Sequence, residues 1–237
     1  MAKQPVYQFY SELRGCEPKI WRRFQVVGTV TLARLSYFVM TMYEMRGQHL
    51  FAMECPVTHN QEFLAPFASS FPKETDGRME ISFELKCAVI PDECKHDYAL
   101  DAKKMKLSML ANKPGLTLNL VYDFGDEWVV ELSLEEVIED APKNRLMPYV
   151  LEGEGYGIIE NCGGVDQLMH IGEVIKDRTH KEFKEISSWL GTDEFDLGAF
   201  DIKDMTYRLQ LVPPLFKKVY ESGVSLYPDD LDYLNRS

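Results

Sequence analysis

Apolar and polar residues alternate along several short stretches of the chain, as expected for strands that bury one face. The segment 6–13 shows this pattern, and the segment 20–27 follows it as a second predicted strand. Gly15 and Pro18 interrupt the chain between them, so the N-terminal region predicts a hairpin-like pair of strands. The segment 79–90 alternates over its whole length, which predicts a half-buried strand of an antiparallel sheet.

A second hairpin is predicted where apolar alternation runs through residues 116–124 and resumes at Trp128. The sequence DFGDEW lies between the two alternating stretches and forms the expected tip of the hairpin. Gly125 is the expected turn residue, with a positive φ that other residues adopt only at a cost.

Helical spacing of apolar residues first appears in the segment 31–45, where Leu32, Leu35, Val39 and Met42 form one stripe. This pattern predicts the main helix covering the sheet. The segment 56–78 contains three prolines and a glycine, and it predicts a long loop or an insertion.

The last third of the chain is predicted to be helical. Residues 179–182 match a capping box ahead of a helix that stops at Gly191. Asp201 is the expected N-cap of a final helix, and Pro213 and Pro214 are expected to end it.

Strands therefore come first and helices last, which predicts an α+β fold. The expected architecture is a mainly antiparallel sheet with one central helix and C-terminal helices packed on it. The length of 237 residues fits a single domain over residues 1–237.

The net charge of the chain argues against some classes of binding partner. Lys and Arg number 26 against 38 Asp and Glu, a formal net charge of −12. Such a protein repels phosphate backbones and anionic membranes, so we do not expect it to bind nucleic acid or a membrane. No stretch is long and apolar enough for a membrane span, and the N-terminus lacks a signal-peptide core. We therefore expect a cytoplasmic protein.

The five cysteines are irregularly spaced and imply no disulfide framework. Cys55 with His59, and Cys94 with His96, lack the tight paired spacing that structural zinc prefers. We accordingly expect no metal and no other cofactor.

Several motifs, in this order, resemble the signature of the plasmid pRiA4b open-reading-frame-three-like family. They are IWRR at 20–23, QHLF at 48–51, YDFGDEW at 122–128, LEGEGYGIIENCGG at 151–164 and FDLGAFDIKDMTYRL at 195–209. The resemblance implies a compact α+β domain similar to passenger proteins of mobile elements, which are sometimes labelled resolvase-like. It implies no reaction, because none is established for the family.

The chain also departs from the family pattern. Val130 stands where family members often carry a His, and Val150 stands where they often carry a Cys. Residues 157–159 replace a Cys-Pro-Pro run, and Asn161 replaces an Asp. These departures remove side chains that could bind a metal.

Polar residues in the same motifs form the candidate site. Carboxylates in adjacent turns can hold a cation or act as an acid–base pair, but they also commonly cap turn amides. His49 could be a ligand or a general base, although a hydrogen-bonded histidine at a helix–strand junction is more common. The candidate residues are His49, Asp123, Asp126, Trp128, Glu152, Glu154, Glu160 and Cys162.

Two functions are compatible with the sequence. The favoured one is a non-catalytic accessory or interaction protein that binds an unknown protein partner or a small ligand. The alternative is a metal-dependent hydrolase with an acidic site in the 122–128 hairpin and the 151–162 loop. Convergence of the acids and His49 in a cleft beside Trp128 would favour the alternative.

Overall fold

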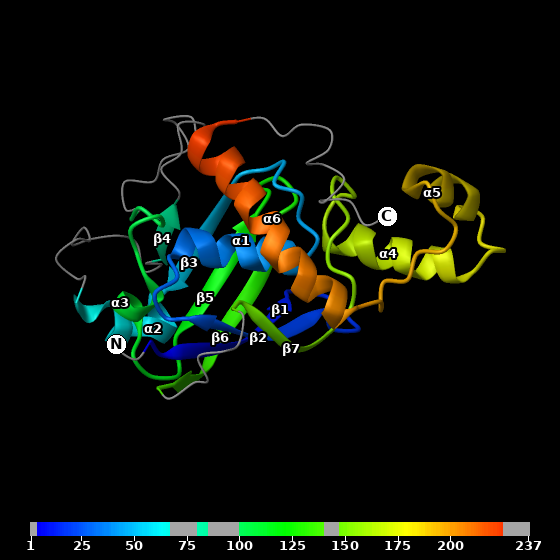
Figure 1. The fold of residues 1–237 in the computed structure, drawn as a ribbon. Helices are drawn as coiled ribbons and strands as arrows, with labels where there is room; N and C mark the ends of the chain where they lie inside the picture. Colours follow the sequence, from blue (N-terminus) through cyan, green and yellow to red (C-terminus); the bar gives the residue numbers. More distant parts are fainter. Residues whose placement is uncertain (1–3, 67–79, 85–99, 140–146, 225–237) are drawn as a thin grey trace.

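The structure is a computed structural model that describes residues 4–66, 80–84, 100–139 and 147–224 (Figure 1). Within these residues, seven strands form one antiparallel sheet in the order β4-β3-β5-β6-β1-β2-β7. Their bounds are β1 Val6–Leu13, β2 Trp21–Val27, β3 Phe51–Pro56, β4 Glu80–Glu84, β5 Thr117–Tyr122, β6 Trp128–Ile138 and β7 Tyr149–Glu154.

The helices pack on the sheet, and α1 and α6 cross the same face of it (Figure 1). The α4–α5 pair lies beside them, at the opposite side of the molecule from β4 (Figure 1). The bounds are α1 Leu32–Met42, α2 Val57–Leu64, α3 Leu107–Leu110, α4 Val165–Lys176, α5 Phe183–Leu190 and α6 Ile202–Ser222. The predicted α+β class, with an antiparallel sheet and helices packed on it, is confirmed.

Strand alternation decides which side chains reach the core. In β1, Tyr7 and Phe9 are buried beneath the helices, whereas the intervening Gln8 is only half-buried. Phe9 lies opposite Phe24 of β2 and Leu134 of β6, so apolar residues of three neighbouring strands form one layer. Helix α1 packs on this apolar layer.

The segment 56–78 begins differently from the expected loop. Its first part is α2, and the residues from 67 to 79 lie outside those that the structure describes. The predicted strand 79–90 is observed as β4, and its remainder also lies outside the described residues.

The prediction that Pro213 and Pro214 end the last helix is wrong, because α6 continues through both to Ser222. A proline inside a helix costs about 3 kcal/mol. Buried apolar side chains on either side of the prolines offset this cost, since each contributes about 1.5–3 kcal/mol. Phe216 and Tyr220 pack their rings against Tyr37 of α1, which carries α6 past the prolines.

The predicted capping box at 179–182 is also wrong. The Thr179 hydroxyl donates to Asp177 at 2.6 Å, and Glu182 is itself the N-cap of α5 without a side-chain bond to the helix. The carboxylate of Glu182 instead contacts His170 of α4 at 2.7 Å. The predicted end at Gly191 and the predicted cap at Asp201 are confirmed.

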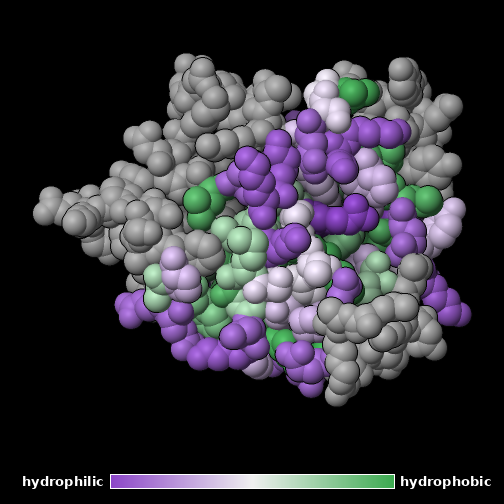
Figure 2. Space-filling model, turned by 60° about the vertical axis from the view of Figure 1, so that its left-hand side comes forward, coloured by the Kyte–Doolittle hydropathy of each residue, from purple (hydrophilic) through white to green (hydrophobic). Residues whose placement is uncertain are grey.

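The surface carries scattered apolar side chains. On the side drawn in Figure 2, hydrophilic residues alternate with more hydrophobic ones. Among the described residues, the large apolar side chains that are well exposed come from several parts of the chain, two of them from α6: Met109, Phe124, Trp189, Ile202, Tyr207 and Val224. In the part of the chain that the structure describes, no helix is long and apolar enough to cross a membrane.

Candidate functional site

The turn between β5 and β6 carries the first candidate residues. Gly125 was expected at positive φ, but the positive values belong to Asp123 (φ 55) and Glu127 (φ 51), which flank the turn. The carboxylate of Asp123 accepts the N–H of Gly125 at 3.0 Å and stabilises the turn. A positive φ at Asp123 is an unfavourable backbone conformation, and interactions with the surrounding structure must offset its cost.

The ring of His49 lies between two carboxylates. Its Nδ1 is 3.4 Å from Oδ2 of Asp123, and its Nε2 is 3.4 Å from Oε2 of Glu160. The N–H of Asp123 also donates to the carbonyl of Leu50 at 3.0 Å, which holds the turn beside the start of β3. Three residues far apart in sequence, His49, Asp123 and Glu160, therefore meet.

Glu160 is the most deeply buried member of this group, with only 3% of its side chain exposed. Its Oε1 accepts the Tyr122 hydroxyl at 2.7 Å and the N–H of Arg46 at 2.6 Å. Burial, together with the neighbouring Glu160 charge, raises the pKa of Tyr122 far above its ordinary value, so this phenol is a donor at neutral pH. Such bonds to a charged acceptor are among the stronger hydrogen bonds in proteins.

The arrangement does not form a chelate. The two nitrogens of an imidazole ring point in different directions, and each faces a different carboxylate, so the two acids do not close on one cation. Among the residues that the structure describes, no group of three or more His, Cys, Asp or Glu is placed to hold a metal ion. A general base also needs a ring nitrogen that can reach a substrate, whereas Nε2 of His49 is buried and each ring nitrogen faces a carboxylate.

Asp126 and Cys162 lie where the turn meets the loop that leads into α4. The Oδ2 atom of Asp126 accepts the N–H of Gly163 at 3.2 Å, which joins the two segments. Burial raises the pKa of the Cys162 thiol to about 11, so the sulfur is protonated at neutral pH and is a weak nucleophile. Its Sγ lies 3.6 Å from the carbonyl of Gly164.

Trp128 lies directly opposite Tyr122 across β5 and β6 and is fully buried in the core. Its indole N–H makes no hydrogen bond within the described residues. The residue therefore lies beside Tyr122 in the core and does not line an open cleft.

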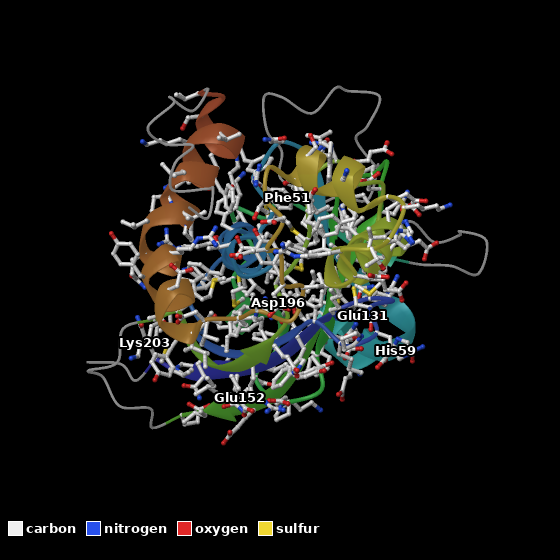
Figure 3. All side chains as sticks on the ribbon, turned by 90° about the vertical axis from the view of Figure 1, so that its right-hand side faces the viewer. Phe51, His59, Glu131, Glu152, Asp196 and Lys203 are labelled. Atoms are coloured by element: carbon white, nitrogen blue, oxygen red, sulfur yellow. The ribbon has the colours of Figure 1, made fainter. Side chains whose placement is uncertain are left out.

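Glu152 and Glu154 are separated from this group. Both belong to β7 and point to the solvent side of the sheet, where Glu152 pairs with Arg23 of β2 at 2.8 Å. Figure 3 shows Glu152 at the outer surface of the sheet. Arg22 of β2 pairs with Gly153, the residue between the two acids, and its side chain points to the opposite face of the sheet. This side chain is fully buried and donates to several backbone carbonyls, including those of Met42, Glu154 and Gly155. The sheet thus lies between these two acids and Glu160.

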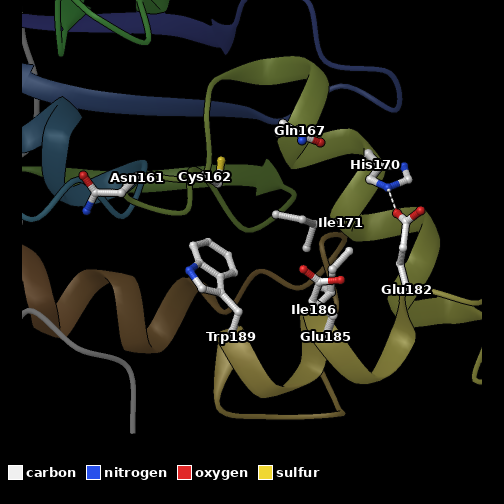
Figure 4. Close-up of a pocket in the computed structure, with 9 residues that line it drawn as sticks. All are labelled: Asn161, Cys162, Gln167, His170, Ile171, Glu182, Glu185, Ile186 and Trp189. Carbon is white, nitrogen blue, oxygen red and sulfur yellow. Dashed lines mark hydrogen bonds and ion pairs between the residues drawn. The ribbon is translucent and has the colours of Figure 1, made fainter.

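A pocket of about 480 Å³ lies on the other side of the 160–164 loop, between that loop, α4 and α5 (Figure 4). Sequence patterns did not indicate it. Its lining residues are Asn161, Cys162, Gln167, His170, Ile171, Glu182, Glu185, Ile186 and Trp189. The sequence offers Trp189, an aromatic residue near the end of the helix predicted to stop at Gly191, as a signal of this pocket.

The wall residues of the pocket are unevenly buried. Ile171 of α4 is buried, whereas α5 contains no buried residue at all. Trp189 of α5 is 52% exposed, and Figure 4 shows it facing the pocket together with Ile186. One wall is therefore part of the packed body, and the other is an exposed amphipathic helix.

Comparison with known proteins gives a family and a fold without a reaction. No curated protein matches the chain. The chain is similar to the crystal structure of MM3350, a protein of unknown function from Methanosarcina mazei Go1. The TM-score is 0.66 and the identity is 27%, over 86% of this chain and 98% of that one. The family model described as "Plasmid pRiA4b ORF-3-like protein" matches residues 5–204, and the chain therefore belongs to this family.

Proposed function

We propose that the protein is a non-catalytic binding protein whose ligand occupies the pocket between α4, α5 and the 160–164 loop. The observation that carries the proposal is the combination of a volume of about 480 Å³ with an exposed Trp189 in its wall. Ligand sites are typically concave and largely apolar, with a few polar groups that orient the ligand. Ile171 and Ile186 supply the apolar part, and the amides of Asn161 and Gln167 supply the polar part.

The exposed apolar surface of α5 supports this proposal energetically. Burying apolar surface contributes roughly 25 cal/mol per Å². A helix without buried residues gains little of this stabilisation from the fold itself. A ligand that covers Trp189 and Ile186 would remove that surface from water and hold α5 against α4.

The residues around His49 have a defined role in this proposal. Glu160 immediately precedes Asn161 and is held by Tyr122 and by the backbone of Arg46. Asp126 holds Gly163 on the other side of Cys162. These bonds fix the loop wall of the pocket before a ligand arrives, which lowers the entropic cost of binding.

The metal-dependent hydrolase has less support. It needs several acids and a free base directed at one point. Both nitrogens of His49 face carboxylates, and Glu152 and Glu154 lie across the sheet from Glu160.

An NMR fragment screen on the ¹⁵N-labelled protein tests the proposal. The expected result is that bound fragments shift the side-chain amides of Asn161 and Gln167 and the indole N–H of Trp189 together. The indole N–H of the buried Trp128 is an internal control that should not move. Fragments that shift residues elsewhere and leave the pocket signals unchanged would contradict the proposal.

A further inference from the structure

We infer that the pocket selects an organic cation, an alkylammonium or guanidinium group carried on an apolar stem. The inference rests on the proposed function and names the ligand class of the same pocket. It comes from the charges and the aromatic surface of the pocket wall.

The carboxylate of Glu185 is the anionic group available to a ligand. It lines the pocket and makes no hydrogen bond or ion pair within the residues that the structure describes. Figure 4 shows its carboxylate at the edge of α5 that faces α4. The side chain of Glu185 is exposed, so its carboxylate is accessible to a cation that enters the pocket from solvent.

The other charged groups in the wall already have partners. Glu182 contacts His170 at 2.7 Å and Lys181 at 3.2 Å. The surrounding segment is also acidic, since residues 160–200 contain nine Asp and Glu against four Lys and Arg. An anionic ligand would therefore meet a repulsive field, and a cation would meet an attractive one.

Trp189 supplies the second feature that suits a cation. Its ring is 52% exposed and lines the pocket one helical turn from Glu185. Cations bind over the face of an indole ring in preference to other aromatic side chains. Ile171 and Ile186 would contact the apolar stem, and the amide oxygens of Asn161 and Gln167 would accept N–H groups.

Two sources could provide this chemistry, a free alkylamine or guanidine and a Lys or Arg side chain of a partner protein. The shared feature is a cationic head on a chain of methylenes. A pocket of about 480 Å³ is large enough for such a side chain in either setting.

The test compares three probes of nearly equal shape and different charge: butylguanidinium, butylurea and pentanoate. Binding is followed by NMR titration of the Trp189 indole N–H. We expect butylguanidinium to bind at least about tenfold more tightly than butylurea, which corresponds to about 1.4 kcal/mol. Pentanoate should bind most weakly.

Matched variants test whether the carboxylate of Glu185 is the charge that binds the cation. Glu185→Gln should lower the affinity for butylguanidinium to near that for butylurea. Glu173→Gln removes the same charge from an exposed position on α4 outside the pocket lining, and it should leave the affinity nearly unchanged. Equal losses in the two variants would overturn the assignment of Glu185.

The outcomes separate this inference from the proposed function. If butylurea or pentanoate binds in the pocket at least as tightly as butylguanidinium, the preference for a cation is overturned. The pocket then remains a binding site. No pocket shift with any of the three probes counts against both. If butylguanidinium binds, a blocked Arg tripeptide identifies the source: tighter binding of the peptide indicates a protein partner, and equal or weaker binding indicates a free cation.

Discussion

The hydroxyl of Tyr122 donates to Oε1 of Glu160 at 2.7 Å, although 38 positions separate the two residues. The bond joins the end of β5 to the loop that forms one wall of the pocket. The same oxygen accepts the N–H of Arg46, so the loop is attached to the sheet and to the segment that follows α1. This attachment makes the loop wall part of the folded core.

Removing the hydroxyl should therefore destabilise the protein. Tyr122→Phe leaves the buried Glu160 with one donor fewer and also removes the acceptor of the Gln48 N–H. Losing one partner of a buried charged group costs about 1–3 kcal/mol. We expect a loss of this size in the free energy of unfolding measured with urea.

Tyr10→Phe is the matched control, because Tyr10 also donates to a carboxylate, that of Glu12, at 2.7 Å. This pair lies on the solvent side of the sheet, and Glu12 has Lys19 as a second partner. The control should lose less than about 1 kcal/mol. Equal losses for the two variants would show that Glu160 is not a buried anchor.

The backbone at Asp123 allows a second prediction. A φ of 55 strains any residue with a Cβ, so Asp123→Gly should be more stable than Asp123→Ala by about 1 kcal/mol. Both variants lose the carboxylate, so the comparison isolates the backbone. Thermal unfolding of the two proteins measures the difference, and a more stable Ala variant would contradict the prediction.

Gly125 should behave differently from a strained turn glycine, because its φ is not positive. A Cβ at this position would lie 3.3 Å from Oδ1 of Asp123, which can shift by a few tenths of an ångström. Gly125→Ala should change the free energy of unfolding by less than about 1 kcal/mol. A loss well above this value would show that the tip tolerates no side chain.

Local sequence patterns predicted the elements whose side chains follow a simple burial rule. Strands β1, β5 and β6 bury alternate residues, so their periodicity was visible. Helix α1 buries the expected stripe and nearly all of its other residues as well, because α6 also packs on it. Pro213 and Pro214 misled the prediction because burial around Phe216 outweighs a local helix-breaking preference. That balance depends on tertiary packing, which a single sequence does not reveal.

The candidate site was predictable only in part. The motifs indicated His49, Asp123 and Glu160, which the structure brings together. Glu152 and Glu154 point away because residues two apart on a strand share a face, and the face was unknown until β7 was paired with β2. The pocket depends on how α5 lies against α4, and no periodicity encodes that relationship.

The buried pair of Arg208 and Glu44 gives a further prediction. Nη1 of Arg208 donates to Glu44 at 2.6 Å, and the side chains are 9% and 4% exposed. Arg208→Met leaves a buried carboxylate without this guanidinium, which should cost about 3 kcal/mol or more. Arg14→Met breaks an exposed pair with Glu131 and should cost about 1 kcal/mol or less in the same urea titration. Similar losses in the two variants would contradict the prediction that the buried pair contributes more to stability than the exposed one.

The attachment of α5 to α4 should weaken at acid pH. The hydrogen bond from His170, and then that from Lys181, lowers the pKa of Glu182 below its ordinary value of 4.5. A carboxylate with a lowered pKa stabilises the folded arrangement above the ordinary value, and this contribution is lost as pH falls through the lowered pKa. The protection of the α5 amides, measured relative to the intrinsic exchange rate at each pH, should therefore fall below pH 4.5. Glu182→Gln should abolish this pH dependence, and an unchanged profile in that variant would contradict the assignment.

The pocket beside Trp189 is, in this proposal, the place where the protein binds its ligand. The most direct measurement is the affinity of a fragment selected on the wild-type protein for two variants, Trp189→Ala and Tyr207→Ala. Both replace an exposed aromatic residue on a helix, and only Trp189 lines the pocket. We predict at least about a tenfold loss of affinity for Trp189→Ala, since stacking on an aromatic ring contributes on the order of 1 kcal/mol or more beyond the contact area itself. Tyr207→Ala should bind as the wild type does. Wild-type affinity in Trp189→Ala, or an equal loss in both variants, would contradict the claim.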